Sequence, residues 1–353
     1  MKKGKTKKKL LRKKVFVFVL LFVVTCIVVA GYTAYSIVLK PNVNAPKGHI
    51  HVYIHTGSNY DELVDILRKG EVLKNETTFF WLAKKKRYNN RVLPGRYKLT
   101  SGMGNNELIN HLRSGNQDPV HLTFNNIRIR EQLARVISQQ LEMDSLQVLS
   151  VFNNLEVFHQ NGLNQENGLL LFIPNTYQVF WNISPEGLLK RMAREYNLYW
   201  NESRRQKAQR MGMTPAEVAV LASIVRAETT KRDEMPTVAG VYVNRLKRNL
   251  LLQADPTLVF ALGDFTITRV LNRHKEIDSP YNTYKHPGLP PGPIALPEPH
   301  VIDAVLNYQS HDYFFFCAKD DFSGYHAFAR TYSEHLQNAR RYQQRLNELG
   351  IRQ

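Results

Sequence analysis

Glu228 is the side chain in this sequence best placed to carry out chemistry, because it is the only carboxylate in the largely apolar stretch Val218–Glu228 (VAVLASIVRAE). A carboxylic acid held against apolar neighbours has its ionised form disfavoured, so its pKa rises. A glutamate tuned in this way can act as a general acid near neutral pH. The alternative is a glutamate at a helix end that simply reaches solvent, and the residue pattern alone leaves both interpretations open.

Two later segments carry groups of the kind that hold sugar rings. The first is Leu252–Thr257 (LQADPT), and the second runs from Tyr281 to Ile294 and contains YNTY and the stiff sequence GLPPGPI. Amides, hydroxyls and aromatic faces at Gln253, Asn282 and Tyr284 predict a substrate-binding wall. The structural alternative is turn capping by the amides and core packing by the tyrosine.

Asp255 is predicted to belong to the same substrate-binding set, and it is also the nearest candidate for a second carboxylate. Most glycosidases use two carboxylates, one to deliver a proton and one as base or nucleophile. An Asp before Pro also commonly starts a turn.

The element that must position Glu228 is a helix. Thr214 can cap it, Pro215 suits its first position, and Glu217 completes a capping box. The residues that follow are apolar nearly all round, which predicts a buried helix. On that helix Leu221 and Glu228 lie on one face together with the intervening apolar positions 224 and 225.

The N-terminus predicts a membrane anchor. Residues 1–14 contain nine Lys or Arg and no acid, and residues 15–39 follow without a charge. Twenty-five helical residues span about 37 Å, enough to cross a hydrocarbon core. The charge asymmetry predicts a cytoplasmic tail (1–14), a single transmembrane helix (15–39) and an exported remainder, in the cell (inner) membrane. A cleaved signal peptide is the competing interpretation, but its apolar region would be shorter.

The formal charge of +18 does not favour nucleic acid as a partner. Half of it lies in the tail, where membrane orientation and anionic lipid explain it. No cofactor and no metal are expected, because neither CxxC nor HExxH occurs. Cys26 lies in the apolar segment and Cys317 far outside it, so no disulfide between them is expected.

The remaining chain predicts an α+β fold. A linker (40–47) precedes a small domain (48–125) of strands at 51–55, 95–99 and 120–124 and helices at 58–67, 77–86 and 105–113. Residues 126–353 then form a mixed helical and loop-rich catalytic domain. In it we expect helices at 214–228, 236–246, 301–308 and 331–349, a buried strand at 313–318, and a loop-rich stretch from the second of these helices to Pro299.

Five sequence blocks in order resemble the endolytic murein transglycosylases, the YceG-like family: LASIVRAET (221–229), VAGVYVNRL (238–246), LQADPT (252–257), YNTY (281–284) and GLPPGPIALP (288–297). YHAFARTYSEH (325–335) is a weaker match. The resemblance implies a LysM-like small domain and a lyase that cleaves peptidoglycan glycan strands internally. It assigns the catalytic glutamate to Glu228.

The resemblance also implies why one acid suffices. Lytic transglycosylases use the 6-hydroxyl of N-acetylmuramic acid (MurNAc) as nucleophile, so Glu228 would protonate the glycosidic oxygen and then accept the hydroxyl proton, leaving a 1,6-anhydro end. The expected partners are glycan strands, membrane lipid and, as a further candidate, peptidoglycan synthases. A peptidoglycan hydrolase with Asp255 activating water and a non-enzymatic wall-binding scaffold stay open as alternatives.

Two positions depart from the family pattern. Arg226 stands where a second glutamate is usual, but two residues turn a helix by about 200°, so position 226 should point away from Glu228. Asn175 stands where an Asp usually follows Pro, and no catalytic role is assigned to it.

Overall fold

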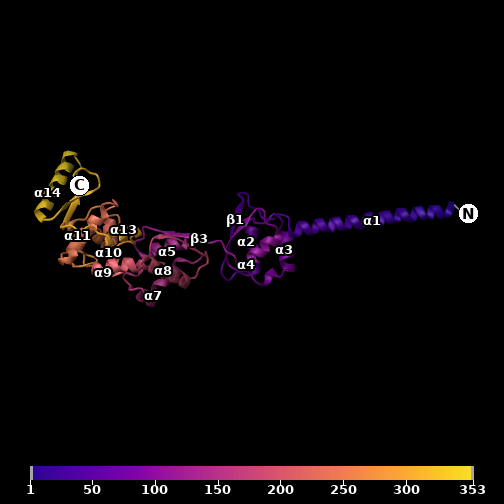
Figure 1. Ribbon diagram of the computed structural model, residues 1–353, viewed down its shortest axis with the longest axis horizontal. Coiled ribbons are helices and arrows are strands. Elements are labelled where there is room, and N and C mark those ends of the chain that lie inside the picture. Colours follow the sequence, from indigo (N-terminus) through magenta and orange to yellow (C-terminus); the bar gives the residue numbers. More distant parts are fainter. Residues whose placement is uncertain (1–2, 351–353) are drawn as a thin grey trace. The chain divides into compact units, whose positions relative to one another are not determined.

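A computed structural model describes residues 3–350 of the chain, with side chains from residue 10 onward. The fold is mixed α and β, as predicted, with long helices and three two-stranded sheets in the described residues (Figure 1). The chain forms two compact units. The first contains residues up to Val120 and the short segment Gln178–Asn182, and the second contains the rest. That the predicted domains 48–125 and 126–353 fold separately stays a prediction.

Helix α1 (Lys3–Val38) contains one stretch long and apolar enough to cross a membrane, Leu10–Val38, and its most apolar 18-residue window has no residue buried in the protein. Its last turn is fixed to the first unit. The amide of Asn105 donates to the Ile37 carbonyl at 2.8 Å. Gly104 lies so close that a Cβ there would approach the Leu39 carbonyl oxygen to 2.5 Å. The chain therefore leaves the apolar helix directly into a packed structure.

The first unit pairs β1 (His49–Ile54) with β2 (Gly95–Thr100) in an antiparallel sheet and packs helices beside it. The helices are α2 (Tyr60–Lys69), α3 (Glu76–Lys85) and α4 (Asn105–Ser114). All five elements lie where the sequence predicts them, within about two residues. The indole of Trp181 packs against the rings of Tyr53 at 5.0 Å and His55 at 5.1 Å, which is why segment 178–182 joins this unit.

The second unit is largely helical. A short sheet joins β3 (Val120–Phe124) to β4 (Asn175–Val179), and residues 121–124 and 175–177 of these strands belong to this unit. The helices between and after them are α5 (Arg130–Ser138), α6 (Ser145–Ser150), α7 (Leu155–Gln160), α8 (Pro185–Tyr199), α9 (Glu202–Arg210), α10 (Pro215–Glu228), α11 (Met235–Lys247), α12 (Asp255–Leu262), α13 (Pro299–Leu306) and α14 (Tyr332–Glu348). The antiparallel pair β5 (Phe315–Ala318) and β6 (His326–Ala329) precedes α14.

Helix α10 forms the centre of this unit, packed against α11 and α13. It begins as predicted: the Thr214 hydroxyl accepts the Glu217 N–H, and the Glu217 carboxylate accepts the Thr214 N–H at 2.7 Å. All residues from Val218 to Val225 are buried. A helix that is apolar all round is stable only in such a core position.

One local prediction is incomplete and one is wrong. The stretch after α11 is loop-rich to Pro299, as predicted, but it also contains α12, which begins at Asp255; Pro256 is accommodated in the first turn, where a helix needs no N–H donor. The strand predicted at 313–318 is not buried. Its residues in β5 are partly exposed, since β5 is one half of a two-stranded hairpin covered on one side by α14.

Candidate active site

Glu228 is the last residue of α10, and its side chain is partly buried at the wall of a cavity. The hydroxyl of Tyr242, on α11, donates to Oε1 of Glu228 at 2.7 Å. Burial raises the pKa of Glu228 from its ordinary value of 4.5 to about 7; the Tyr242 hydrogen bond opposes this rise, and the charge of Asp255 adds to it. Removal from water is the largest cause of this rise, which agrees with the position of the side chain at the cavity wall; the catalytic role of Glu228 stays a prediction. Near neutral pH this group can both give and take a proton.

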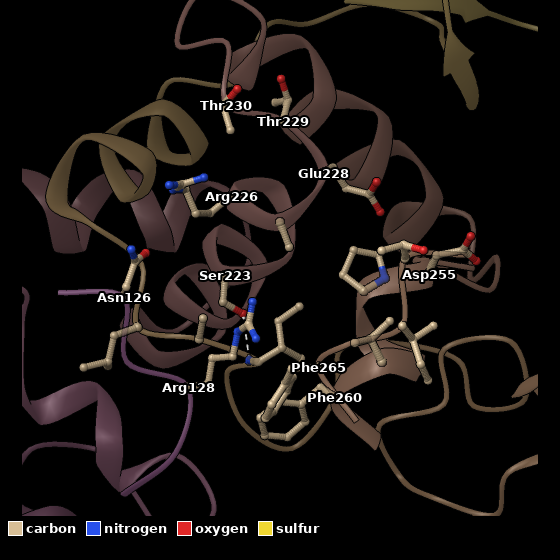
Figure 2. Close-up of a pocket in the computed structure, with 18 of the residues that line it drawn as sticks. Asn126, Arg128, Ser223, Arg226, Glu228, Thr229, Thr230, Asp255, Phe260 and Phe265 are labelled. Atoms are coloured by element: carbon tan, nitrogen blue, oxygen red, sulfur yellow. Dashed lines mark hydrogen bonds between the residues drawn. The ribbon is translucent and has the colours of Figure 1, made fainter. Parts of the chain in front are cut away.

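Two cavities meet at Glu228. The larger has a volume of about 1020 Å³, and the smaller about 360 Å³. Glu228 and Asp255 line both. The larger cavity is walled by α10, the first turns of α12, the loop around Phe265 and the segment from Ile294 to Leu296 (Figure 2). The smaller is walled by Tyr242, Tyr284 and the β5–β6 hairpin. Parts of one ligand can therefore bind in both cavities, with Glu228 between them.

Asp255 and Tyr284 act as a pair at the junction of the two cavities. The Tyr284 hydroxyl donates to Oδ1 of Asp255 at 2.5 Å. Burial and the neighbouring carboxylate raise the pKa of Tyr284, so it stays a hydrogen-bond donor. The ammonium of Lys275 lies 4.8 Å from the Tyr284 ring centre. The sequence segments around 255 and 284 are thus brought together beside Glu228.

Asn282 is fully buried, and its amide is used within its own loop. Its Nδ2 donates to the carbonyls of Lys275 at 2.9 Å and Ile277 at 2.8 Å, and its Oδ1 accepts the Tyr284 N–H at 3.0 Å. All three bonds shape the loop that carries Tyr284. The structure therefore places Asn282 behind the cavity wall, where it fixes the position of the tyrosine.

Gln253 is exposed at the smaller cavity and adopts a left-handed backbone conformation with φ of +50°. Such a conformation is uncommon for a residue with a side chain and must be held by its surroundings. Arg245 provides this support: its guanidinium donates to the carbonyls of Leu251 at 3.0 Å and Leu252 at 2.7 Å. The Gln253 side chain is thus presented to the cavity by a fixed turn.

The proline-rich segment forms a wall of the larger cavity. Ser223, on α10, accepts the Ile294 N–H at 3.1 Å and donates to the Val220 carbonyl at 2.7 Å (Figure 2). Gly292 is required here, because a Cβ would approach the Glu166 carbonyl oxygen to 2.5 Å. The stiff sequence is therefore docked against the helix that carries Glu228.

Arg226 and Asn175, the two positions that differ from the sequence pattern named above, lie in different places. Figure 2 shows Arg226 and Glu228 leaving α10 in different directions, as the helical geometry predicts. Arg226 forms an ion pair with Glu298 at 3.1 Å on another part of the cavity wall. Asn175 is exposed at the start of β4 and does not line either cavity. Glu228 therefore keeps its own environment although position 226 is basic.

A second buried carboxylate stabilises the end of α10. Glu234 accepts from the Thr229 hydroxyl at 3.0 Å and from both the backbone N–H and Nδ1 of His326 at 2.7 and 2.8 Å. Thr229 directly follows Glu228. The network thus holds the β5–β6 hairpin, one wall of the smaller cavity, against the residue beside the acid.

Sequence reasoning missed Tyr242, Arg245 and Glu234 as site residues. Tyr242 and Arg245 are three positions apart on a helix whose neighbouring residues, Val238, Val241 and Val243, are all buried. Polar groups inside such a helix require partners, and that requirement was a usable signal. Glu234 stands just before this helix and gave no comparable signal.

Comparisons with known proteins agree on one family. The model of the YceG-like family matches residues 52–341. The endolytic murein transglycosylase of Bacillus subtilis (strain 168) is 30% identical over 328 residues, covering 88% of this chain and 89% of the relative. A protein of the same name from Streptococcus pneumoniae serotype 2 is 28% identical, covering 92% of this chain and 64% of the longer relative.

A crystal structure is also similar. It is that of a yceG-like protein from Listeria monocytogenes, with a TM-score of 0.55 and 26% sequence identity, covering 82% of this chain and 99% of the other. The sequence blocks and the fold therefore point to the same family.

Proposed function

The chain belongs to the YceG-like family, and from that premise we propose that it is an endolytic peptidoglycan lytic transglycosylase. This lyase cleaves the bond between MurNAc and N-acetylglucosamine and leaves 1,6-anhydro-MurNAc ends. The observation that carries the proposal is Glu228, a carboxyl group with a pKa raised to about 7 at the junction of two cavities.

Glu228 performs both proton transfers. Protonated Glu228 gives its proton to the glycosidic oxygen as the bond between that oxygen and the anomeric carbon breaks. The resulting carboxylate then takes the proton of the MurNAc 6-hydroxyl, whose oxygen bonds to the anomeric carbon. No water is consumed, and the acid is regenerated. A pKa near the working pH suits a group that must serve as acid and then as base.

Tyr242 assists by holding one carboxyl oxygen. Because its hydroxyl donates to Oε1, the transferable proton of Glu228 resides on Oε2. The rise in the Tyr242 pKa, caused first by burial, keeps this hydroxyl protonated. Tyr242 is a positioning residue in this scheme.

Cleavage within a strand requires sugars on both sides of the broken bond. The cavities on the two sides of Glu228 supply that space, and their total size suits several sugar rings. Gln253, Asp255 and Tyr284 contact the strand near the acid, and Asn282 acts through the loop that positions Tyr284.

The anchor restricts where this reaction occurs. We place residues 1–14 in the cytoplasm, residues 15–39 across the cell membrane and the remaining chain outside, on the charge asymmetry and the apolar span. The small domain (48–125) is LysM-like in this proposal and assists strand binding. An anchored enzyme reaches newly made strands, so it ends strand elongation, and peptidoglycan synthases are its candidate neighbours.

Mass analysis of the products tests the reaction. Full-length protein in lipid nanodiscs should convert purified glycan strands into fragments whose new ends are lighter by one water than reducing ends. Reducing ends would identify a hydrolase, and the absence of cleavage would identify a scaffold. Either result overturns the proposal.

A further inference from the structure

Arg128 places a positive charge in the larger cavity, and the reaction scheme does not use this charge. Its guanidinium points into the cavity in Figure 2, and the residue is exposed. Within residues 10–350, no carboxylate forms an ion pair with it. By contrast, Arg226 on the same wall is paired with Glu298. Arg128 is therefore available to an anion from outside the chain.

The position of Arg128 is built by the fold. Asn126, two residues earlier, has φ of +51°, a left-handed conformation that Asn adopts readily at sharp turns. Ile127 is buried, and its carbonyl accepts the Leu296 N–H at 2.7 Å. The Arg128 N–H itself donates to the Gln132 side chain at 2.8 Å. The chain thus turns sharply, and both ends of the peptide group just before the arginine are held by hydrogen bonds.

The guanidinium rests on the ring of Phe265, 4.5 Å from its centre. A guanidinium that contacts an aromatic ring through its face keeps the N–H donors at its edge available for hydrogen bonds. A guanidinium held in this way loses little freedom when it binds a planar carboxylate through two hydrogen bonds.

The charges around Arg128 favour an anion. Arg269 lines the same cavity and has no carboxylate partner among the described residues. The cavity's three carboxyl groups have other partners: Glu298 pairs with Arg226, Asp255 accepts from the Tyr284 hydroxyl, and Glu228 accepts from the Tyr242 hydroxyl.

We propose that Arg128 binds a carboxylate of the peptidoglycan strand, carried by the peptide stem or by the lactyl group of a MurNAc without a stem. The inference rests on the proposed function. The sugars of the strand have no other acidic group attached to them, so a fixed, unpaired arginine in the strand-binding cavity has this partner. Arg128 then makes the enzyme prefer strands that carry free carboxylates.

The experiment compares three strand preparations with full-length protein in nanodiscs: stem-bearing strands, the same strands with their carboxylates converted to amides, and strands stripped of stems by an amidase. For the wild type, amidation should raise KM about tenfold, the effect of losing one charge-assisted contact. Arg128→Gln should lose this discrimination, while Arg128→Lys should retain part of it because the charge remains. On stripped strands, dependence on Arg128 assigns the contact to the lactyl carboxylate, and independence assigns it to the stem.

Arg210→Gln is the matched control, because Arg210 is exposed on α9 and lines neither cavity. It should discriminate like the wild type. If Arg128→Gln still distinguishes free from amidated strands, or if the wild type never does, the inference is wrong. Such a result leaves the lyase reaction itself intact, because wild-type cleavage of each preparation is measured in the same experiment.

Discussion

Replacing Glu228 with Gln should lower the activity of the protein and, above neutral pH, raise its stability. Gln keeps the size of the side chain and an oxygen that can accept from Tyr242, but it cannot donate an acidic proton. General acid–base groups contribute about 10²- to 10⁴-fold to a rate, and Glu228 fills both roles, so we expect activity to fall at least about 10³-fold.

The stability effect follows from the raised pKa of Glu228. In the unfolded chain the group titrates near 4.5, and in the folded protein near 7. Between these pH values the folded state binds more protons than the unfolded state, so wild-type stability falls as the pH rises through this window. Above pH 7 the full penalty is about 3 kcal/mol at most, and solvent contact of the side chain reduces it towards about 1 kcal/mol. Glu228→Gln should therefore be more stable than the wild type at pH 8 by about 1 to 3 kcal/mol, and equally stable below pH 4.5.

The assay is denaturant unfolding of the full chain followed by tryptophan fluorescence. Two of the three tryptophans, Trp81 and Trp181, belong to the first unit and are replaced by Phe, so that buried Trp200 reports on the unit that contains Glu228. Glu131→Gln, at an exposed carboxylate on α5, is the control and should show no pH-dependent gain. The same pH dependence in Glu228→Gln and wild type, or activity within tenfold of wild type, would refute the reasoning.

Three further substitutions test the surroundings of the acid. Tyr242→Phe removes the hydrogen bond that lowers the pKa of Glu228, so the alkaline limb of the kcat/KM profile should move up by roughly one pH unit; an unmoved limb would exclude this coupling. Asn282→Ala leaves three backbone groups without partners and should lower stability by about 2 to 4 kcal/mol in the same denaturant assay, together with activity; a stable, inactive variant would instead favour direct substrate contact. Gly240 lies inside α11, and Gly240→Ala places a Cβ 2.3 Å from the Gln309 carbonyl oxygen. This substitution should lower the free energy of unfolding by about 1 to 3 kcal/mol, whereas an unchanged value would show that the contact relaxes freely.

The sequence predicted best those elements whose signals are local. The capping box at Thr214 and Glu217 fixes the start of α10 through residues three apart, and the apolar run after it has no stable location except a core. The β1–β2 pair and the helices of the first unit follow from alternation and capping in the same way. Start signals of this kind also exist at Asp255, but the proline after it suggested a turn as readily as a first helical position.

The partners of Glu228 were not predictable in this way, because each comes from a different part of the chain. Tyr242 reaches Glu228 only because α11 packs against α10, and Tyr284 meets Asp255 only because the amide of Asn282 folds its loop. A sequence shows that a buried polar group needs a partner, but not which distant residue supplies it. The raised pKa of Glu228 is itself such a joint property, since burial produces it while Tyr242 limits it. The packing of α10 on α11 therefore sets the protonation of the acid, and the pH profile of Tyr242→Phe measures how much the Tyr242 contact contributes to it.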